Sequence, residues 1–259
     1  MRINIIGSGN VATHLGRAIM TAGHEIACVV SHDAAHARSL ASAVNAIAAT
    51  SVAQAPQADV TIISVSDNAI AEVAADLRRY EVSPIVAHTS GATPLDSLAG
   101  LPHRGVFYPC QTFSKGDNVD VSEVPFLIEA SDSQTAKALT LLAESIGASA
   151  TPCDSAQRAL LHLAAVFASN FTNHLLLQAG EIMRRAGLPA TILRPLVEKT
   201  VSKAFDMGAK DAQTGPARRL DTKTLQTHRR MMDTQWQTAI YDTLTRSIMA
   251  TYHPDSEIE

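Results

Sequence analysis

The stretch INIIGSGNVATHL, from Ile3 to Leu15, decides the fold expected for the first part of this chain. It opens with an apolar run, Ile3 to Ile6, which is typical of a buried strand. Glycines follow at positions 7 and 9, a small alanine stands at position 12, and a helical pattern begins at Val11. A strand, a glycine turn and a helix in this order predict a dinucleotide-binding site.

Each small residue of this turn has a physical role in such a site. Gly7 permits the tight turn, and Gly9 lets the backbone approach a pyrophosphate without a side chain in the way. Ala12 is small enough for the helix to pack on the strand. The first turn of the helix then offers free N–H groups and a positive dipole end. The alternative is a glycine-rich turn that binds nothing.

Strands and helices go on alternating after this turn. The pattern predicts a doubly wound α/β sheet that is parallel and covered by helices on both faces. We expect further strands at 25–30, 59–65, 85–88, 105–108 and 125–129, and helices at 11–21, 34–44 and 68–79.

The second half of the chain shows no strand pattern. A long apolar helical stretch runs from Ser155 to Ala186, and further helices are expected at 189–207, 221–228 and 234–252. We therefore expect a Rossmann dinucleotide-binding domain over residues 1–152 and an all-helical domain for substrate binding and dimerisation over 153–259.

Composition excludes several classes of partner. The chain has 259 residues, a net charge of -4 and three widely spaced cysteines. This charge gives no reason to expect nucleic acid or an anionic membrane as a partner. The cysteines have neither metal-site nor disulfide spacing, and no continuous apolar run approaches the roughly 20 residues of a membrane span. We expect a cytoplasmic protein without a metal.

The second strand favours one cofactor over another. It ends in Ser31 and His32 without an acid at its tip, whereas NAD enzymes usually place an acid there to bind the ribose. A neutral tip with basic groups nearby, including Arg38, favours NADP and argues against S-adenosylmethionine. Asp33 is close enough to keep NAD as an alternative, and His32 and Arg38 fit ordinary surface residues nearly as well.

Polar clusters also follow the third and fourth main strands, at the edge where ligands of such sheets bind. Ser66 and Asp67 fit equally well as a helix cap. The expected cofactor residues are Gly7, Ser8, Gly9, Asn10, Val11, Ser31, His32, Val65, Ser66, Thr89, Ser90 and Gly91.

The long helix after Ser155 is apolar almost all round, which predicts burial on all sides by neighbours or at a dimer interface. His162, Ser169 and Asn173 share one stripe, with Asn170 at its edge. Buried polar groups need partners, so this stripe predicts either core hydrogen bonds or a substrate wall. We expect His162 to donate a proton during hydride uptake and Asn170 to orient the reacting group, with Ser169 and Asn173 contacting substrate.

The segment TGPARRLD, residues 214–221, is a dense turn signal. Asp221 is placed to cap the next helix. Thr214 and Arg219 are candidates for binding an anionic substrate, and a plain interhelical loop is the alternative.

Five motifs together carry a family resemblance. GSGNVA (7–12), HTSGATPLDSL (88–98), GVFYPCQTF (105–113), HLAAVFASNF (162–171) and TGPARRLD resemble a family of bacterial Rossmann-like proteins whose C-terminal half is a domain of unknown function. That family is similar in architecture to pyrroline-5-carboxylate reductase, ketopantoate reductase and deazaflavin-dependent NADP oxidoreductases. The resemblance implies a nicotinamide-nucleotide domain, a helical domain like that of 6-phosphogluconate dehydrogenase, and a homodimer formed through the helical domain.

The resemblance also implies site residues. His162 and Asn170 match the family's histidine and asparagine on the long helix, and the TGP loop matches at Thr214 to Asp221. Leu220 departs from the family's frequent glycine, which puts a tight backbone role for that loop in doubt. The long helix lacks the catalytic lysine of the hydroxyacid dehydrogenases near His162.

The leading hypothesis is an NADP-dependent oxidoreductase that reduces a small carbonyl or imine compound. One alternative is a dinucleotide-binding or redox-sensing protein without catalysis, which the missing lysine favours. Another is an enzyme that uses reduced deazaflavin to reduce NADP, for which Arg218, Arg219 and Lys223 form the only suitable basic cluster.

Overall fold

The computed structural model describes residues 1–255, and the chain divides into two compact units, Met1–Ser169 and Asn170–Glu259. We expected domains of 1–152 and 153–259, whereas this division falls inside the long helix. The first turns of that helix belong to the first unit because the buried side chain of Arg158 ties them to it.

The first unit is built on one sheet of eight strands in the order β3-β2-β1-β4-β5-β6-β7-β8. Neighbours from β3 to β6 pair in parallel, as expected, whereas β7 is antiparallel to β6 and β8 is parallel to β7. The strands are β1 (Arg2–Ile6), β2 (Glu25–Val30), β3 (Ile47–Ala49), β4 (Val60–Ile63), β5 (Ile85–His88), β6 (His103–Pro109), β7 (Phe126–Ala130) and β8 (Ala150–Pro152).

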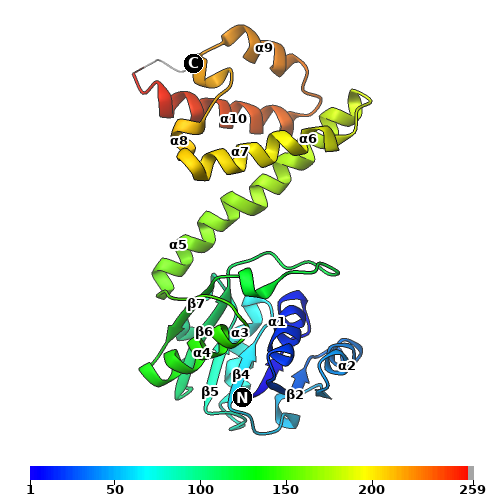
Figure 1. Ribbon diagram of the computed structural model, residues 1–259, viewed down its shortest axis with the longest axis vertical. Coiled ribbons are helices and arrows are strands. Elements are labelled where there is room, and N and C mark those ends of the chain that lie inside the picture. Colours follow the sequence, from blue (N-terminus) through cyan, green and yellow to red (C-terminus); the bar gives the residue numbers. More distant parts are fainter. Residues whose placement is uncertain (256–259) are drawn as a thin grey trace. The chain divides into compact units, whose positions relative to one another are not determined.

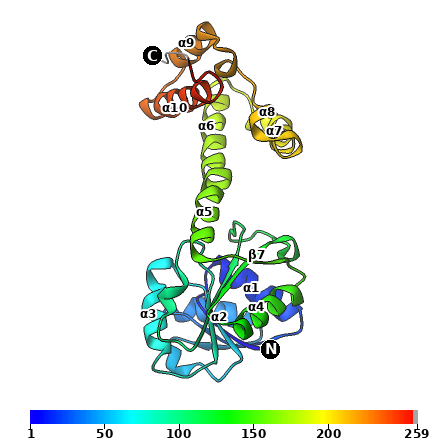
Figure 2. The ribbon, with the colours of Figure 1, turned by 90° about the vertical axis from the view of Figure 1, so that its left-hand side faces the viewer.

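Helices cover both faces of this sheet, and each face has its own core. The helices α1 (Asn10–Thr21), α2 (Ala34–Ala43) and α4 (Ser133–Ser145) pack on one face, together with the short η3 (Val121–Glu123). The other face is covered by α3 (Asp67–Leu77), η1 (Val52–Gln54) and η2 (Leu95–Leu98). Figure 2 shows α3 and α4 on opposite sides of the sheet.

Most expected elements are confirmed, and the bounds of β2 and β5 are those expected. The sequence analysis missed β3, α4 and β8. The two strands are three residues long, too short to show a period. The helix α4 was recognisable from its cap, since the Asp132 carboxylate accepts a hydrogen bond of 2.8 Å from the Thr135 backbone N–H.

One helical run extends from Ser155 to Arg185 (Figure 1). It begins as α5 (Ser155–Ala165), passes through the π-helical η4 (Val166–Phe171) and continues as α6 (Thr172–Arg185). The π-helical turns hold Ser169 and Asn170, two of the expected site residues. Such turns are rare and frequently occur at functional sites.

The expectation that this helix is buried on all sides is wrong for a single chain. Leu160 is 70% exposed, Phe167 63% and Leu177 56%. By length and composition alone the run could also cross a membrane, with a mean hydropathy of 1.3. That is weak evidence, because the run also includes the buried, ion-paired Arg158 and the polar His162 and Asn173. Apolar composition predicts that a surface must be covered, without saying by what.

The second unit is helical, as expected. After α6 come η5 (Ala190–Leu193), α7 (Arg194–Met207), α8 (Ala209–Ala212), η6 (Ala217–Arg219), α9 (Thr222–Arg230) and α10 (Gln235–Tyr252) (Figure 1). Polar contacts join its helices, such as the 3.1 Å ion pair between Arg229 and Asp242. Among its described residues, 170–255, only Ala217 and Gln237 are buried, so one copy of this unit has almost no core of its own.

Candidate functional site

Gly7 brings the end of β1 against the end of β4. Its φ is +122°, and a Cβ at this position would lie 2.0 Å from the carbonyl oxygen of Ser64. Its N–H donates to the Val30 carbonyl at 2.8 Å. No other residue type fits this backbone and this space, so the first glycine of the turn is required by packing as well as by conformation.

Gly9 leaves the start of α1 open. It is the N-cap residue, it has no side chain with which to cap the helix, and a Cβ there would meet nothing within 4 Å. The first turn of α1 contains no acid, and Ala12 is fully buried against the sheet, as expected. Free N–H groups at a helix start with open space before them fit a pyrophosphate.

The tip of β2 offers hydroxyl groups rather than a free acid. The Ser31 and Ser8 hydroxyls lie 2.8 Å apart, and His32 is exposed. Asp33 is committed to capping α2, since its carboxylate accepts from the backbone N–H groups of Ala35 at 2.8 Å and His36 at 3.0 Å. These hydrogen bonds lower the pKa of Asp33, and the one from His36 has the larger effect. One oxygen of the carboxylate considered for the ribose, Oδ1, is therefore engaged in the cap.

A loop after β6 lies over the start of α1. The Asn10 amide donates to the Phe113 carbonyl at 3.0 Å, so this expected cofactor residue uses its side chain to hold the loop. A cavity of ≈ 620 Å³ runs along Ser8 and Gly9 beneath the loop. Its lining adds cationic residues that the sequence analysis did not select, Arg17 and Lys115.

The ends of β4 and β5 bring other expected cofactor residues together. The Thr89 hydroxyl donates to the Ser64 hydroxyl at 3.2 Å, and the Thr89 backbone N–H donates to the Ile63 carbonyl at 3.0 Å. Val65 is half-buried beside them. Ser66 is the N-cap residue of α3, as the capping alternative predicted, although its hydroxyl makes no capping hydrogen bond.

The Ser90 hydroxyl forms hydrogen bonds within the loop after β5 and is therefore not free to bind a ligand. Its Oγ accepts from the backbone N–H groups of Ala92 at 3.2 Å and Thr93 at 2.9 Å. Its own N–H donates to Nδ1 of His88 at 3.2 Å. Burial, followed by the positive charge of Arg158, lowers the pKa of His88 to about 4, so this imidazole is neutral at pH 7.

Gly91 lies where two aromatic side chains meet. A Cβ at this position would lie 2.7 Å from both Nδ1 of His162 and Cζ of Tyr108. The Tyr108 hydroxyl lies 3.5 Å from His162 Nδ1, at the long limit of a hydrogen bond. Burial and the adjacent Cys110 thiol raise the pKa of Tyr108 to about 12, and the phenol is protonated at pH 7.

A buried ion pair fixes the helix that carries His162. The Arg158 side chain is 1% exposed and pairs with Glu129 of β7. It also donates to the Thr93 carbonyl at 2.7 Å, and Ser155 donates to Glu129 at 2.8 Å. Because Arg158 and His162 are four residues apart, they lie one turn apart on the same helix face. The ion pair of Arg158 and Glu129 thus fixes where His162 lies relative to the loop after β5.

The remaining expected residues lie elsewhere. Ser169, Asn170 and Asn173 follow His162 along the helix, and Asn170 and Asn173 are exposed. In the second unit, Asp221 caps α9 as expected, accepting from the Thr224 N–H at 3.1 Å. Arg219 is exposed on η6.

Leu220 adopts the left-handed conformation, with a φ of 54°. Leucine therefore adopts the same backbone turn for which glycine is better suited. The leucine that stands here in place of the family's frequent glycine does not abolish the turn.

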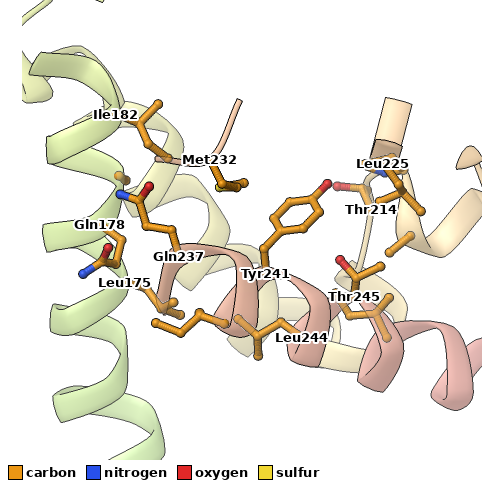
Figure 3. A pocket seen from close by; sticks show the side chains of 15 residues that line it. Leu175, Gln178, Ile182, Thr214, Leu225, Met232, Gln237, Tyr241, Leu244 and Thr245 are labelled. Atoms are coloured by element: carbon orange, nitrogen blue, oxygen red, sulfur yellow. The ribbon is translucent and has the colours of Figure 1, made fainter. Parts of the chain in front are cut away.

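Thr214 lines a cavity of ≈ 320 Å³ inside the second unit. Figure 3 shows Gln178 and Ile182 of α6 on one side of it, and the Tyr241 ring of α10 pointing toward Thr214. Its walls are mostly apolar, which suits a hydrophobic group rather than an anion.

Sequence reasoning missed Tyr108, Arg158 and Glu129. Tyr108 lies within the GVFYPCQTF motif, which served only for the family resemblance. Arg158 is the one charged residue between Ser155 and Gly180, and this was the available signal, because a charge enters a core only with a partner.

Comparisons with known proteins agree with this architecture. Residues 2–89 match the family described as "NADP oxidoreductase coenzyme F420-dependent", and residues 124–248 match a "Domain of unknown function (DUF2520)". Among curated proteins, none matches the chain.

Solved structures resemble nearly the whole chain. A Bacteroides fragilis protein, described as a "putative NADP oxidoreductase", is 40% identical, with a TM-score of 0.89 over 96% of this chain and 97% of that one. An imine reductase from Myxococcus stipitatus in complex with NADP+ is 16% identical, with a TM-score of 0.66 and coverage of 98% and 93%. A 1-pyrroline-5-carboxylate reductase from Streptococcus pyogenes is 15% identical, with a TM-score of 0.62 and coverage of 96% and 98%. The last two show the shared fold. The first shows that the chain belongs to the family that joins these two domains.

Proposed function

We propose that this family member is an NADP-dependent oxidoreductase that reduces a small carbonyl or imine compound. The observation that carries the proposal is the open start of α1 at Gly9, on the same sheet edge as the Tyr108 and His162 pair. A dinucleotide whose pyrophosphate binds at α1 extends along this edge. The nucleotide half and the acid–base half of such a reaction are therefore both present in the first unit.

The residues present fit NADP. Gly7, Ser8, Gly9 and Val11 would hold the pyrophosphate, and Val65 and Thr89 would line the path toward the nicotinamide. The hydroxyls of Ser8 and Ser31 and the exposed His32 suit a 2′-phosphate, whereas Asp33 uses one carboxylate oxygen, Oδ1, to cap α2. Bound NADPH would supply a hydride at this edge.

The proton that accompanies the hydride is proposed to enter the site through His162. General acids of this kind contribute roughly 10²–10⁴-fold to rates. The substrate contacts expected of Ser169, Asn170, Asn173, Thr214 and Arg219 stay predictions. The names of the relatives suggest imines as a substrate class, and an imine or carbonyl group needs just one hydride and one proton.

The first experiment is calorimetric titration with NADPH, NADH and S-adenosylmethionine in parallel. We expect micromolar binding of NADPH, weaker binding of NADH and none of S-adenosylmethionine. Absorbance at 340 nm then follows NADPH oxidation with 1-pyrroline and a panel of small carbonyl compounds. Absence of nucleotide binding would overturn the proposal. Binding without turnover of any compound would favour the redox-sensing alternative. Turnover only with reduced deazaflavin would favour the alternative of an enzyme that reduces NADP with this second cofactor.

We further propose a homodimer formed through the helical unit. The support is the near-absence of a core among residues 170–255, and exposed apolar side chains such as Phe205, 88% exposed, and Trp236, 71% exposed. Such surfaces need a partner. Light scattering after size exclusion tests this. Leu177→Glu should weaken the dimer, whereas Leu141→Glu on α4, an exposed leucine of the first unit, is the matched control. A monomeric wild type would refute it. We place the protein in the cytoplasm, without a membrane or nucleic-acid partner.

A further inference from the structure

We propose that Tyr108 is the catalytic residue that hands the proton to the substrate, and that His162 is a positioning residue that orients and resupplies it. This inference rests on the proposed function and assigns a role to a residue on the sheet rather than on the helix.

The position of Tyr108 on the sheet supports this role. Val106 of β6 is paired with His88, the last residue of β5, so Tyr108 lies two residues further on, beyond the carboxyl end of β5. This edge is where a nicotinamide would lie if the pyrophosphate binds at α1, because β1 and β4 form the switch point of the sheet. Tyr108 as a residue is half-buried, between the exposed surface and the core.

Gly91 shows that the two rings share one space. A Cβ at position 91 would collide with both of them, at 2.7 Å each. A glycine here therefore lets the phenol and the imidazole approach the loop after β5 together. The ion pair of Arg158 and Glu129 holds the helix turn below His162, and His162 in turn limits where the Tyr108 hydroxyl can point.

The proposed step balances in protons and electrons. Hydride reaching the carbon of a C=N or C=O group moves the π electrons onto the nitrogen or oxygen, and that atom takes the phenolic proton of Tyr108. The phenolate then takes a proton from His162, and a hydronium ion of the solvent restores the proton of His162, so that one solvent proton is consumed per turnover. The phenol is protonated at pH 7, so it is ready to donate before each turnover.

A binding experiment tests the location of Tyr108 without any turnover. The protein is labelled with 3-fluorotyrosine, and the ¹⁹F resonance of position 108 is assigned by its loss in Tyr108→Phe. We expect this resonance to shift when NADP+ binds, whereas that of Tyr80, an exposed tyrosine after α3, stays unchanged. Nucleotide binding that leaves the Tyr108 resonance in place overturns the inference while the proposed function stands. Absence of nucleotide binding overturns both.

Kinetics with NADPH and 1-pyrroline test the role. Tyr108→Phe should lower kcat at least about 100-fold and leave the Kd for NADPH within about twofold, because it removes only the phenolic hydroxyl group that donates the proton. Tyr80→Phe is the matched control and should retain wild-type kcat. In His162→Ala, added imidazole should restore part of kcat, which a purely structural loss would not allow. A Tyr108→Phe enzyme with kcat within a few-fold of wild type would overturn the assignment, and a wild type without turnover would overturn it together with the proposed function.

Discussion

Replacing Arg158 by methionine should destabilise the first unit by roughly 3–4 kcal/mol. The guanidinium is 1% exposed and joins three elements, through Glu129 of β7, the Thr93 carbonyl after β5 and its own helix α5. Methionine fills much of the volume of the arginine stem but offers no charge or donor. The substitution thus removes the interaction while it leaves the packing nearly intact.

The magnitude follows from what is left unpaired. Breaking a buried ion pair typically costs about 3–5 kcal/mol, because the surviving charge stays buried. Here the surviving Glu129 side chain is 17% exposed and still accepts from Ser155, so the lower end applies. The Thr93 carbonyl loses a charged donor, which adds about 1 kcal/mol. The double variant Arg158→Met with Glu129→Leu leaves no buried charge and should recover more than half of the loss.

Urea unfolding followed by far-UV circular dichroism measures the effect. Trp236 is the only tryptophan and lies in α10, so its fluorescence reports the helical unit separately. The circular dichroism transition should move to lower urea in Arg158→Met, and the fluorescence transition should move less. A single variant within about 1 kcal/mol of wild type, or a double variant no more stable than the single one, would refute the reasoning.

Three further predictions follow from single positions. Gly7→Ala should cost more than about 3 kcal/mol and abolish nucleotide binding, because the methyl group would overlap the Ser64 carbonyl; unfolding and calorimetry check it, and a stable binder contradicts it. Leu220→Gly should raise stability by up to about 1 kcal/mol, since it relieves a left-handed leucine; a loss in a thermal melt would count against this. His88 has a pKa near 4 when folded and 6.5 as its ordinary value, so protonation favours unfolding and wild type loses up to about 3 kcal/mol as the pH falls from 6.5 to 4. The His88→Asn variant should lose correspondingly less stability between pH 6.5 and 4. If the unfolding free energies of the two proteins fall in parallel with pH, the prediction is wrong.

The sequence was sufficient to predict the strand, the glycine turn and the helix that form the edge of the sheet at the candidate site. The run from Ile3 to Ile6, the glycines and the helix that follows are local signals, each readable from a few residues. The parallel order of β1 to β6 follows from the same alternation. The reversal at β7 was not readable, because its direction depends on how the chain returns after the loop over α1, and no short pattern encodes that return.

The chemistry of the site was only half predictable, for a related reason. His162 was a reasonable candidate because imidazole suits proton transfer and its helix carried a polar stripe. Its partner Tyr108 lies 54 residues earlier in the chain, on an expected strand whose motif served only for the family resemblance. Their meeting depends on the register of β6 and on the turn at which α5 is anchored. Neither quantity is local, so only the folded chain brings them together.

The long helix shows where composition stops being informative. An apolar surface all round states that water must be excluded from it, because roughly 25 cal/mol is at stake for each Å² of apolar surface. It does not state which chain excludes the water. Within one copy Leu160 and Phe167 stay mostly exposed, and the described residues of the helical unit bury only Ala217 and Gln237. The sequence thus shows that this surface must be covered, and the homodimer proposed above is one way to cover it.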